Sequence, residues 1–260
     1  MNILDQLADY ARERVEQAKR RLPTETIRDQ AHTLPKGSFA LERALRKPEI
    51  SFICECKKAS PSKGLIAEDF PYLQIAEEYE AAGADAISVL TEPKWFLGSD
   101  DYLREIAASV SVPCLRKDFT VDPYMIYEAK LLGASAVLLI CSILEPGQLK
   151  EYHGICEELG LSALVEAHDE EEIRMALDAG ARMIGVNNRN LKDFTVDTEN
   201  SRRLRAMVPS ETLFVSESGV KDAADVAALR EIGADAVLVG EALMRAKDKH
   251  RMLKQLKGEA

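Results

Sequence analysis

The sequence lacks the short motifs with which many proteins hold a dinucleotide, a nucleoside triphosphate or a metal. Neither the G-x-G-x-x-G pattern nor a P-loop occurs among the 260 residues. None of the five cysteines forms a C-x-x-C pair, and no histidine stands at a metal-ligand spacing from them. These absences argue against a dinucleotide fold and a metal site, and we interpret the cysteines as reduced core residues.

The sequence also lacks an excess of positive charge and any long apolar run. Its net charge of −10 argues against non-specific binding to nucleic acid or to an anionic membrane. No stretch reaches the roughly 18 apolar residues that a membrane span needs, and the first 21 residues are too charged for a signal peptide. We therefore expect a cytoplasmic protein, in which an anionic substrate would need a local cluster of cations or amides.

A segment of glycine followed by an apolar run recurs four times. It begins at Gly83, Gly133, Gly180 and Gly233, at separations of 50, 47 and 53 residues. Each glycine follows an amphipathic stretch, which predicts a glycine just after a helix and leading into a strand. The repeat therefore indicates regular helix–strand units.

Four more apolar runs lie between these segments, so that eight strands are expected in all. The additional runs cover residues 51–56, 113–117, 162–166 and 212–217, and helical patterns lie between them. Eight such units in about 210 residues favour a closed (βα)8 TIM barrel over an open doubly wound sheet. The whole chain is then one barrel domain. Residues 1–47 form an N-terminal helical extension packed on it: a helix over about 2–21, then a proline-rich turn region.

Polar side chains gather where five of these strands end. Charged groups at the carboxyl ends of parallel strands are typical of the mouth of a barrel, where such folds keep their chemistry. In residues 54–57, two cysteines alternate with a glutamate and a lysine, so cysteines that face the helices leave the charged pair facing the axis. The candidate residues are Glu55, Lys57, Lys117, Glu166, Asn187 and Glu217.

Lysines and carboxylates crowded into one site shift each other's proton affinity, as acid–base catalysis requires. A lysine near its ordinary pKa of about 10.4 is a poor acid at neutral pH unless burial or a neighbouring cation lowers that pKa. We expect Lys57 and Lys117, from neighbouring strands, to lower the pKa of one another. Glycine-containing turns over 57–66, 216–220 and 238–243 are candidates for phosphate binding by backbone N–H groups.

Seven motifs at the strand ends resemble the indole-3-glycerol phosphate synthase family: CECKKASPSKG, LRKDF, LLICSIL, LVEAHDEEE, GVNNRNL, VSESGV and LVGEALM. The resemblance implies a monofunctional barrel enzyme of tryptophan biosynthesis, without cofactor or metal. Such an enzyme converts 1-(2-carboxyphenylamino)-1-deoxyribulose 5-phosphate to indole-3-glycerol phosphate with loss of CO2 and water. It further implies a small phosphorylated substrate, no nucleic-acid or membrane partner, and a monomer or weak homodimer.

The resemblance also implies a role for each matching residue. Lys117 matches the general acid of ring closure and Glu166 the base of the later dehydration. Lys57, paired with Glu55, matches a lysine that contacts the substrate carboxylate. Three residues match family residues that orient the substrate: Asn187, Arg189 and Glu217. The phosphate site of the family is matched by Ser60, Ser218, Gly219, Gly240 and Glu241. The apolar wall around the aromatic ring is matched by Pro61, Phe119, Leu138 and Leu191. One departure is Ala67, where an arginine is common, and it leaves open how the phosphate loop is held closed.

Two other functions fit the same barrel. One is a Schiff-base aldolase or a sugar-phosphate isomerase, since a lysine of the barrel can act as a nucleophile. The other is a barrel that only binds a phosphosugar and regulates a partner; phosphate capture needs amides and one cation, so this function leaves the second glutamate and both lysines unexplained.

Overall fold

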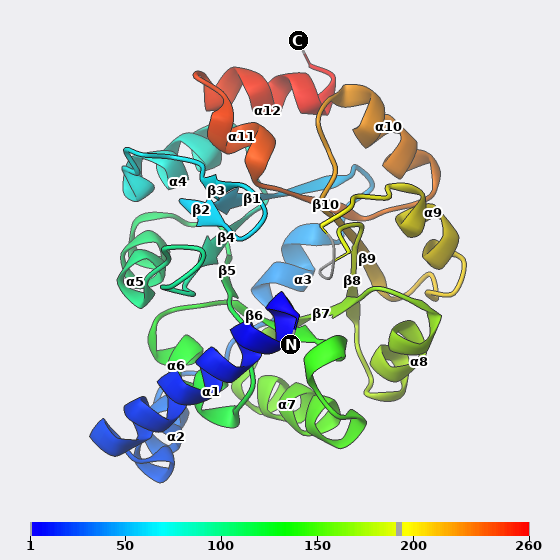
Figure 1. Cartoon of the computed structure of the whole chain (residues 1–260). Helices are drawn as coiled ribbons and strands as arrows, with labels where there is room; N and C mark the ends of the chain where they lie inside the picture. Colours follow the sequence, from blue (N-terminus) through cyan, green and yellow to red (C-terminus); the bar gives the residue numbers. More distant parts are fainter. Residues whose placement is uncertain (1, 191–193, 260) are drawn as a thin grey trace.

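The computed structural model describes residues 2–190 and 194–259 of the chain. Eight parallel strands close into a barrel in the order β1-β10-β9-β8-β7-β6-β5-β4, and Figure 1 shows the helices ringed around them. The (βα)8 barrel expected from the repeat is therefore confirmed. A separate two-stranded antiparallel hairpin, β2–β3, follows the first barrel strand.

The barrel strands agree with the expected runs to within a few residues. The strands are β1 (Ser51–Cys56), β2 (Ala59–Ser60), β3 (Gly64–Leu65), β4 (Ala86–Leu90), β5 (Cys114–Lys117), β6 (Ala136–Ile140), β7 (Ser162–Ala167), β8 (Met183–Asn187), β9 (Leu213–Glu217) and β10 (Ala236–Val239). The helices are α1 (Ile3–Arg21), α2 (Thr24–Thr33), α3 (Ala40–Leu45), α4 (Tyr72–Ala81), α5 (Asp100–Ser109), α6 (Pro123–Leu131), η1 (Cys141–Ile143), α7 (Pro146–Leu159), α8 (Glu170–Asp178), α9 (Glu199–Arg205), α10 (Ala223–Glu231), α11 (Glu241–Arg245) and α12 (Lys249–Lys257).

The repeated glycines lie where the pattern predicts. Gly83, Gly133, Gly180 and Gly233 each follow the C-cap residue of a helix with φ between 78° and 86°. This left-handed backbone is open to glycine without steric cost and ends the helix before the next strand. All five cysteines are buried and unpaired, as expected of core residues.

The N-terminal segment differs from the expected turn region. It holds two further helices, α2 and α3, because Pro23 stands at the N-cap of α2, where the missing N–H costs nothing. Ile27 and Ala31 of α2 are buried and Leu41 and Leu45 of α3 are fully covered, so packing stabilises both helices despite the prolines. The secondary structure of this region therefore depends on where the prolines stand and not on how many there are.

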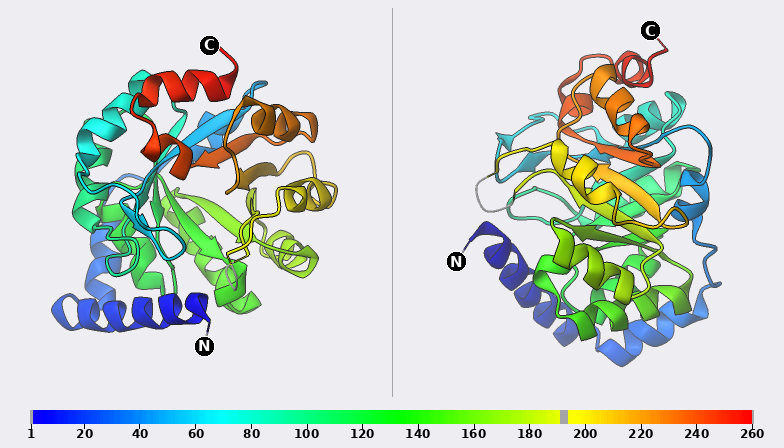
Figure 2. Two further views of the ribbon diagram at one scale, coloured as in Figure 1. Left: turned by 45° about the horizontal axis from the view of Figure 1, so that its top comes forward. Right: turned by 90° about the vertical axis from the view of Figure 1, so that its right-hand side faces the viewer.

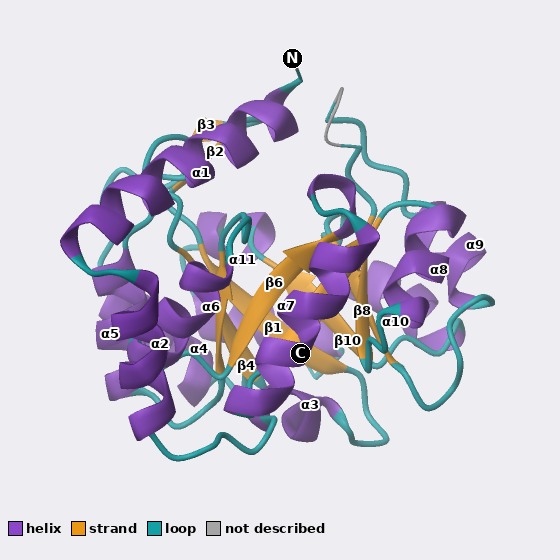
Figure 3. Ribbon diagram, turned by 90° about the horizontal axis from the view of Figure 1, so that it is seen from below, coloured by secondary structure: helices purple, strands orange, loops and turns teal. Residues whose placement is uncertain are grey.

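The three N-terminal helices reach both ends of the barrel. Figure 3 shows α1 and the β2–β3 hairpin towards one end and α3 at the other, and Figure 2 shows α1 against the outside of the barrel. Arg14 of α1 ion-pairs with Asp118, just after β5, at 2.6 Å. Glu42 of α3 accepts two hydrogen bonds from Arg182, just before β8. In the described part of the chain, no helix combines the length and apolarity needed to span a membrane.

Candidate active site

The register of the parallel strands puts the candidate residues on the inner face of the barrel. Glu55 pairs in register with Ser88, Lys117 with Leu90, and Asn187 with Glu217, while Glu166 is level with Gly185. Neighbours in register point to the same face of a sheet, so one face carries all of these side chains. Cys54 and Cys56 alternate with Glu55 and face the helices, as the sequence pattern predicts.

Lys117 lies at the centre of the charged cluster. Its Nζ is 3.5 Å from Oε2 of Glu217 and 3.7 Å from Oε2 of Glu166. Burial by itself would lower the pKa of Lys117, but Glu217, Glu166 and Glu55 together raise it well above its ordinary value. Lys117 therefore holds its proton firmly at neutral pH.

The expectation that the two lysines lower each other's pKa was wrong for Lys117. β4 lies between β1 and β5 in the barrel, so Lys57 and Lys117 do not come from neighbouring strands. Instead Lys57 Nζ ion-pairs with Oε1 of Glu55 at 2.8 Å, and this carboxylate largely balances the positive charge of Lys57. Carboxylates, rather than a second cation, dominate the surroundings of Lys117.

Glu55 and Glu217 respond to the cluster in opposite directions. Burial would raise the pKa of Glu55, but Lys57 and Lys117 lower it below its ordinary value, and Ser88 Oγ donates a hydrogen bond to it at 3.2 Å. For Glu217, burial and the charges of Glu166 and Glu55 outweigh Lys117 and raise the pKa to about 8. Glu217 is thus the carboxyl group of the cluster whose pKa is raised furthest towards neutral pH, and its charge depends on that of Lys117.

Two glycines make room for this cluster. A Cβ on Gly185 would lie 2.1 Å from Oε1 of Glu217, and a Cβ on Gly240 would lie 2.7 Å from Oε1 of Glu55 and 3.0 Å from Nζ of Lys57. The structure therefore supplies a second reason for glycine at position 240, besides the expected approach of its amide to a phosphate. Any side chain there displaces the Glu55–Lys57 pair.

Most of the remaining candidate residues that the structure describes lie just past the carboxyl ends of the barrel strands, in loops or in short elements. Ser60 is in β2, Pro61 follows it, and Ser218 (φ 65°) and Gly219 (φ 97°) turn the chain after β9. Glu241 begins α11, and its side chain ion-pairs with Lys63 at 3.5 Å. Leu138 is buried in β6, and Arg189 donates to the carbonyl of Phe194. Leu191 lies outside the described residues.

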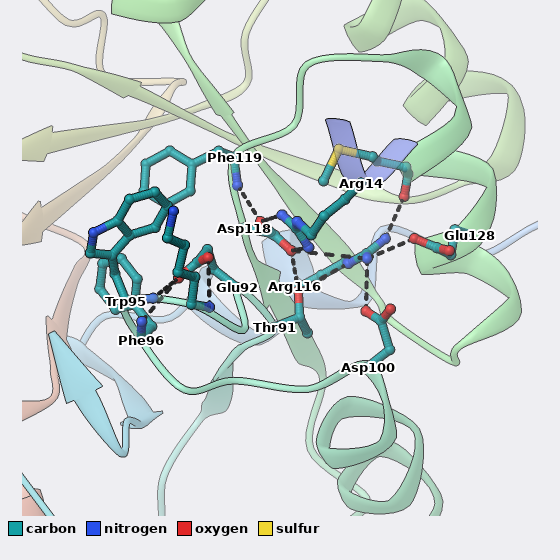
Figure 4. A network of polar contacts seen from close by, with 12 residues as sticks. Arg14, Thr91, Glu92, Trp95, Phe96, Asp100, Arg116, Asp118, Phe119 and Glu128 are labelled. Carbon is teal, nitrogen blue, oxygen red and sulfur yellow. Dashed lines mark hydrogen bonds and ion pairs between the residues drawn. The ribbon is translucent and has the colours of Figure 1, made fainter. Parts of the chain in front are cut away.

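Phe119 belongs to an aromatic wall that the sequence motifs did not indicate in full. Its ring centroid is 6.0 Å from that of Phe96, on the loop between β4 and α5. The buried Glu92 holds this loop by accepting hydrogen bonds from the backbone N–H groups of Lys94, Trp95 and Phe96 (Figure 4). The wall is therefore built by two loops.

A buried ionic network supports the β5 end of the site from outside the barrel. Asp118 accepts two hydrogen bonds from Arg14, and one each from Thr91 and the backbone N–H of Phe119 (Figure 4). Arg116 lies 4.0 Å away and pairs with Asp100 and Glu128. The only sequence signal for this network was that the LRKDF motif lies at the expected end of a strand.

His168 is a further residue of the site that the sequence did not single out. It stands two residues after Glu166, just past the end of β7, and its Nε2 is 3.4 Å from Oε1 of that glutamate. Its only sequence signal was its place inside the LVEAHD motif.

Lysines and carboxylates at the carboxyl ends of parallel strands define a (βα)8-barrel enzyme that works by acid–base chemistry. The sequence model of one family, indole-3-glycerol phosphate synthase, matches residues 4–256. The chain belongs to the indole-3-glycerol phosphate synthase family.

Similar proteins bear out this assignment. The indole-3-glycerol phosphate synthase of Ruminiclostridium cellulolyticum is 58% identical over 99% of this chain and 100% of its own length. That of Lachnoclostridium phytofermentans is 49% identical over 98% of both. Among solved structures, 3-hexulose-6-phosphate synthase from Salmonella typhimurium aligns with a TM-score of 0.65 at 14% identity, over 80% of this chain and 97% of that one. A likeness at that identity shows the fold alone.

Proposed function

We propose that this chain is a carboxy-lyase that closes the indole ring of 1-(2-carboxyphenylamino)-1-deoxyribulose 5-phosphate in tryptophan biosynthesis. The observation that carries the proposal is the protonated Lys117 held among Glu217, Glu166 and Glu55 in the barrel, in a chain of this family. Ring closure on a ketone places negative charge on oxygen, and a fixed ammonium group stabilises that charge and delivers the proton. Lys117 is the acid in this proposal.

The other charged residues serve the later steps. Loss of CO2 and then of water restores the aromatic ring, and the water step needs both an acid and a base. Glu166 is the base. Lys57, held by Glu55, contacts the substrate carboxylate and is the candidate acid for the departing hydroxyl. Glu217, whose pKa burial raises to about 8, can take up a proton near neutral pH and then donate a hydrogen bond to a substrate hydroxyl.

The loop residues bind the two ends of the substrate. Backbone N–H groups and hydroxyls can take the phosphate, and the aromatic wall can take the anthranilate ring. Asn187 and Arg189 orient the hydroxyls and the carboxylate. The proposed phosphate site is Ser60, Ser218, Gly219, Gly240 and Glu241, the last through its amide, and the proposed wall is Pro61, Phe119, Leu138 and Leu191, to which Phe96 is added.

We further propose that the whole chain forms one domain, with residues 1–47 packed on the barrel, and acts as a monomer or weak homodimer in the cytoplasm. The ion pairs of Arg14 and Glu42 with the barrel support a single domain. The free, buried cysteines suit a reducing compartment. Lysine and glutamate supply the acid–base steps, so the proposed mechanism involves no cofactor or metal, and it involves no nucleic acid or membrane.

An indole fluorescence assay tests the function. Adding the carboxyphenylamino ribulose phosphate to wild-type protein should produce indole fluorescence. Lys117→Ala should reduce kcat by at least about 10²-fold, the worth of a positioned acid, and change KM much less. Lys47→Ala is the matched control, because that lysine pairs with Asp85 at the opposite end of the barrel.

Two results would contradict the proposal. A wild-type protein that forms no indole product, but is trapped by borohydride with a sugar phosphate, would favour a Schiff-base aldolase. A Lys117→Ala variant that keeps kcat within a few-fold of wild type would remove Lys117 as the acid.

A further inference from the structure

His168 lies between two carboxylates, and its ring orientation is held by one of them. Glu172 of α8 accepts hydrogen bonds from the backbone N–H of His168 at 2.8 Å, and its Oε2 lies 3.0 Å from Nδ1 of the ring. Ser142 of η1 donates to the other oxygen of Glu172. Asn200 of α9 donates to the carbonyl of His168 at 3.2 Å. Three residues from three elements thus fix where the ring points.

This anchoring determines which nitrogen faces the active site. Because Nδ1 meets a carboxylate oxygen, it carries a proton in either charge state of the ring. Nε2 then points at Oε1 of Glu166, 3.4 Å away. Within the described residues this buried Nε2 has no hydrogen-bond partner at rest. A bare nitrogen lone pair facing an ionised carboxylate is repulsive, so the contact is favourable only when one proton lies between Nε2 and Glu166.

We propose that His168 is a positioning residue for Glu166: held by Glu172, it presents Nε2–H to the carboxylate and aims that carboxylate as the base. This inference rests on the function proposed above, and it adds a residue that does not contact the substrate. The arrangement is similar to a catalytic triad, in which a buried acid orients an imidazole towards the reacting group. Here the imidazole acts on a second carboxylate.

The electrostatic surroundings of the ring agree with a protonated state. Burial lowers the pKa of His168, but the hydrogen bond with Glu172 and the charges of Glu166, Glu172 and Glu217 raise it above its ordinary value. The pKa of Glu172, which burial would raise, is lowered by His168 and Ser142. The charged and titratable groups that face the pair are Lys117 from β5, Cys141 from η1, Asp169 and Glu172 at α8, and Glu217 from β9.

Two substitutions separate the two contacts of the ring. His168→Asn retains an amide that can reach Glu172 but removes the group that faces Oε1 of Glu166, whereas His168→Gln places a neutral N–H near that oxygen. In His168→Asn, the carboxylate of Glu166 loses a neighbouring positive charge and is protonated more easily. The acidic limb of the kcat profile should then move up by about 1 pH unit, with KM within about threefold of wild type. The shift in His168→Gln should be smaller.

A control and a second measurement keep the test independent of catalysis. His153 is a buried histidine of α7 away from the site, so His153→Asn should leave the pH profile unchanged. The chain has only four histidines, so their ring signals can be assigned by substitution in an NMR titration. Replacing Glu166 by Gln should lower the titration midpoint of His168 by about 1 unit and leave that of His153 in place.

The outcomes divide clearly. A raised acidic limb in His168→Asn together with a lowered His168 midpoint in Glu166→Gln supports the proposal. A loss of kcat with an unshifted pH profile overturns it, since that result indicates packing alone. An unchanged His168 midpoint in Glu166→Gln also overturns it. A wild-type protein without indole-forming activity would refute the proposed function, while the NMR titration would still decide the coupling of His168 to Glu166.

Discussion

Asp118→Asn removes a buried carboxylate that joins α1 to the β5 end of the site. The carboxylate accepts four hydrogen bonds: two from Arg14, one from Thr91 and one from the N–H of Phe119. An asparagine of the same shape offers one oxygen, so its NH2 group must face at least two donors. Arg116, at 4.0 Å, loses a counter-ion as well.

The expected cost is large for a single isosteric change. Removing one partner of a buried ion pair costs about 3–5 kcal/mol because the other charge stays buried. Arg14 retains 20% side-chain exposure and can reach water, so we expect the lower end, about 3 kcal/mol. For a domain of roughly this size, that loss lowers Tm by roughly 6–12 °C. Thermal unfolding at pH 7, followed by circular dichroism with a rescan for reversibility, measures it.

The pH dependence of this effect has a definite sign. Burial by itself would raise the pKa of Asp118, but Arg14 and Arg116 lower it below its ordinary value. A carboxyl group with a lowered pKa stabilises the fold above its unfolded pKa, about 3.9, and this stabilisation is lost as the pH falls through the folded value. The Tm difference between wild type and Asp118→Asn should therefore be full at pH 7 and shrink only in acid.

A double-mutant cycle identifies the source of the loss. Arg14→Met keeps the apolar stem, and the double variant should cost at least about 1.5 kcal/mol less than the sum of the two single changes. Arg12→Met is the matched control on the same helix, because its pair with Asp9 is exposed on both sides, and its Tm should not change measurably. Additive single effects, or an Asp118→Asn variant within 2 °C of wild-type Tm, would refute the buried-pair reasoning.

Three further substitutions test the residues at the carboxyl end of the barrel. Glu166→Gln keeps size but removes basicity, so single-turnover mixing should show substrate consumed before indole fluorescence rises; simultaneous changes at the wild-type rate would exclude Glu166 from the mechanism. Gly240→Ala should raise KM through the proposed phosphate site and also lower kcat, since its Cβ would lie 2.7 Å from Oε1 of Glu55. Gly219→Ala should mainly raise KM and weaken inhibition by inorganic phosphate, because position 219 has φ 97° at the proposed phosphate loop. Equal effects of the two glycine changes on kcat and KM would contradict this division.

The local sequence pattern was enough to predict the strands, the glycines that end helices, and which side chains face the barrel axis. A strand alternates its side chains with a period of two, so Glu55 and Lys57 could be assigned to one face and the cysteines to the other without coordinates. Glycine after a helix is likewise a local backbone requirement, and Gly83 shows the predicted left-handed φ. Both inferences need only neighbouring residues.

Tertiary structure alone decided the charge states and the partners. Lys117 lies beside Glu217 and Glu166, and the sum of their fields reversed the expected direction of its pKa shift. Arg14 meets Asp118 across 104 positions of the chain. Barrel closure, not sequence spacing, sets such distances, and electrostatic effects depend on those distances and on burial. The sequence could therefore name the residues at the mouth of the barrel, but not which of them hold a proton.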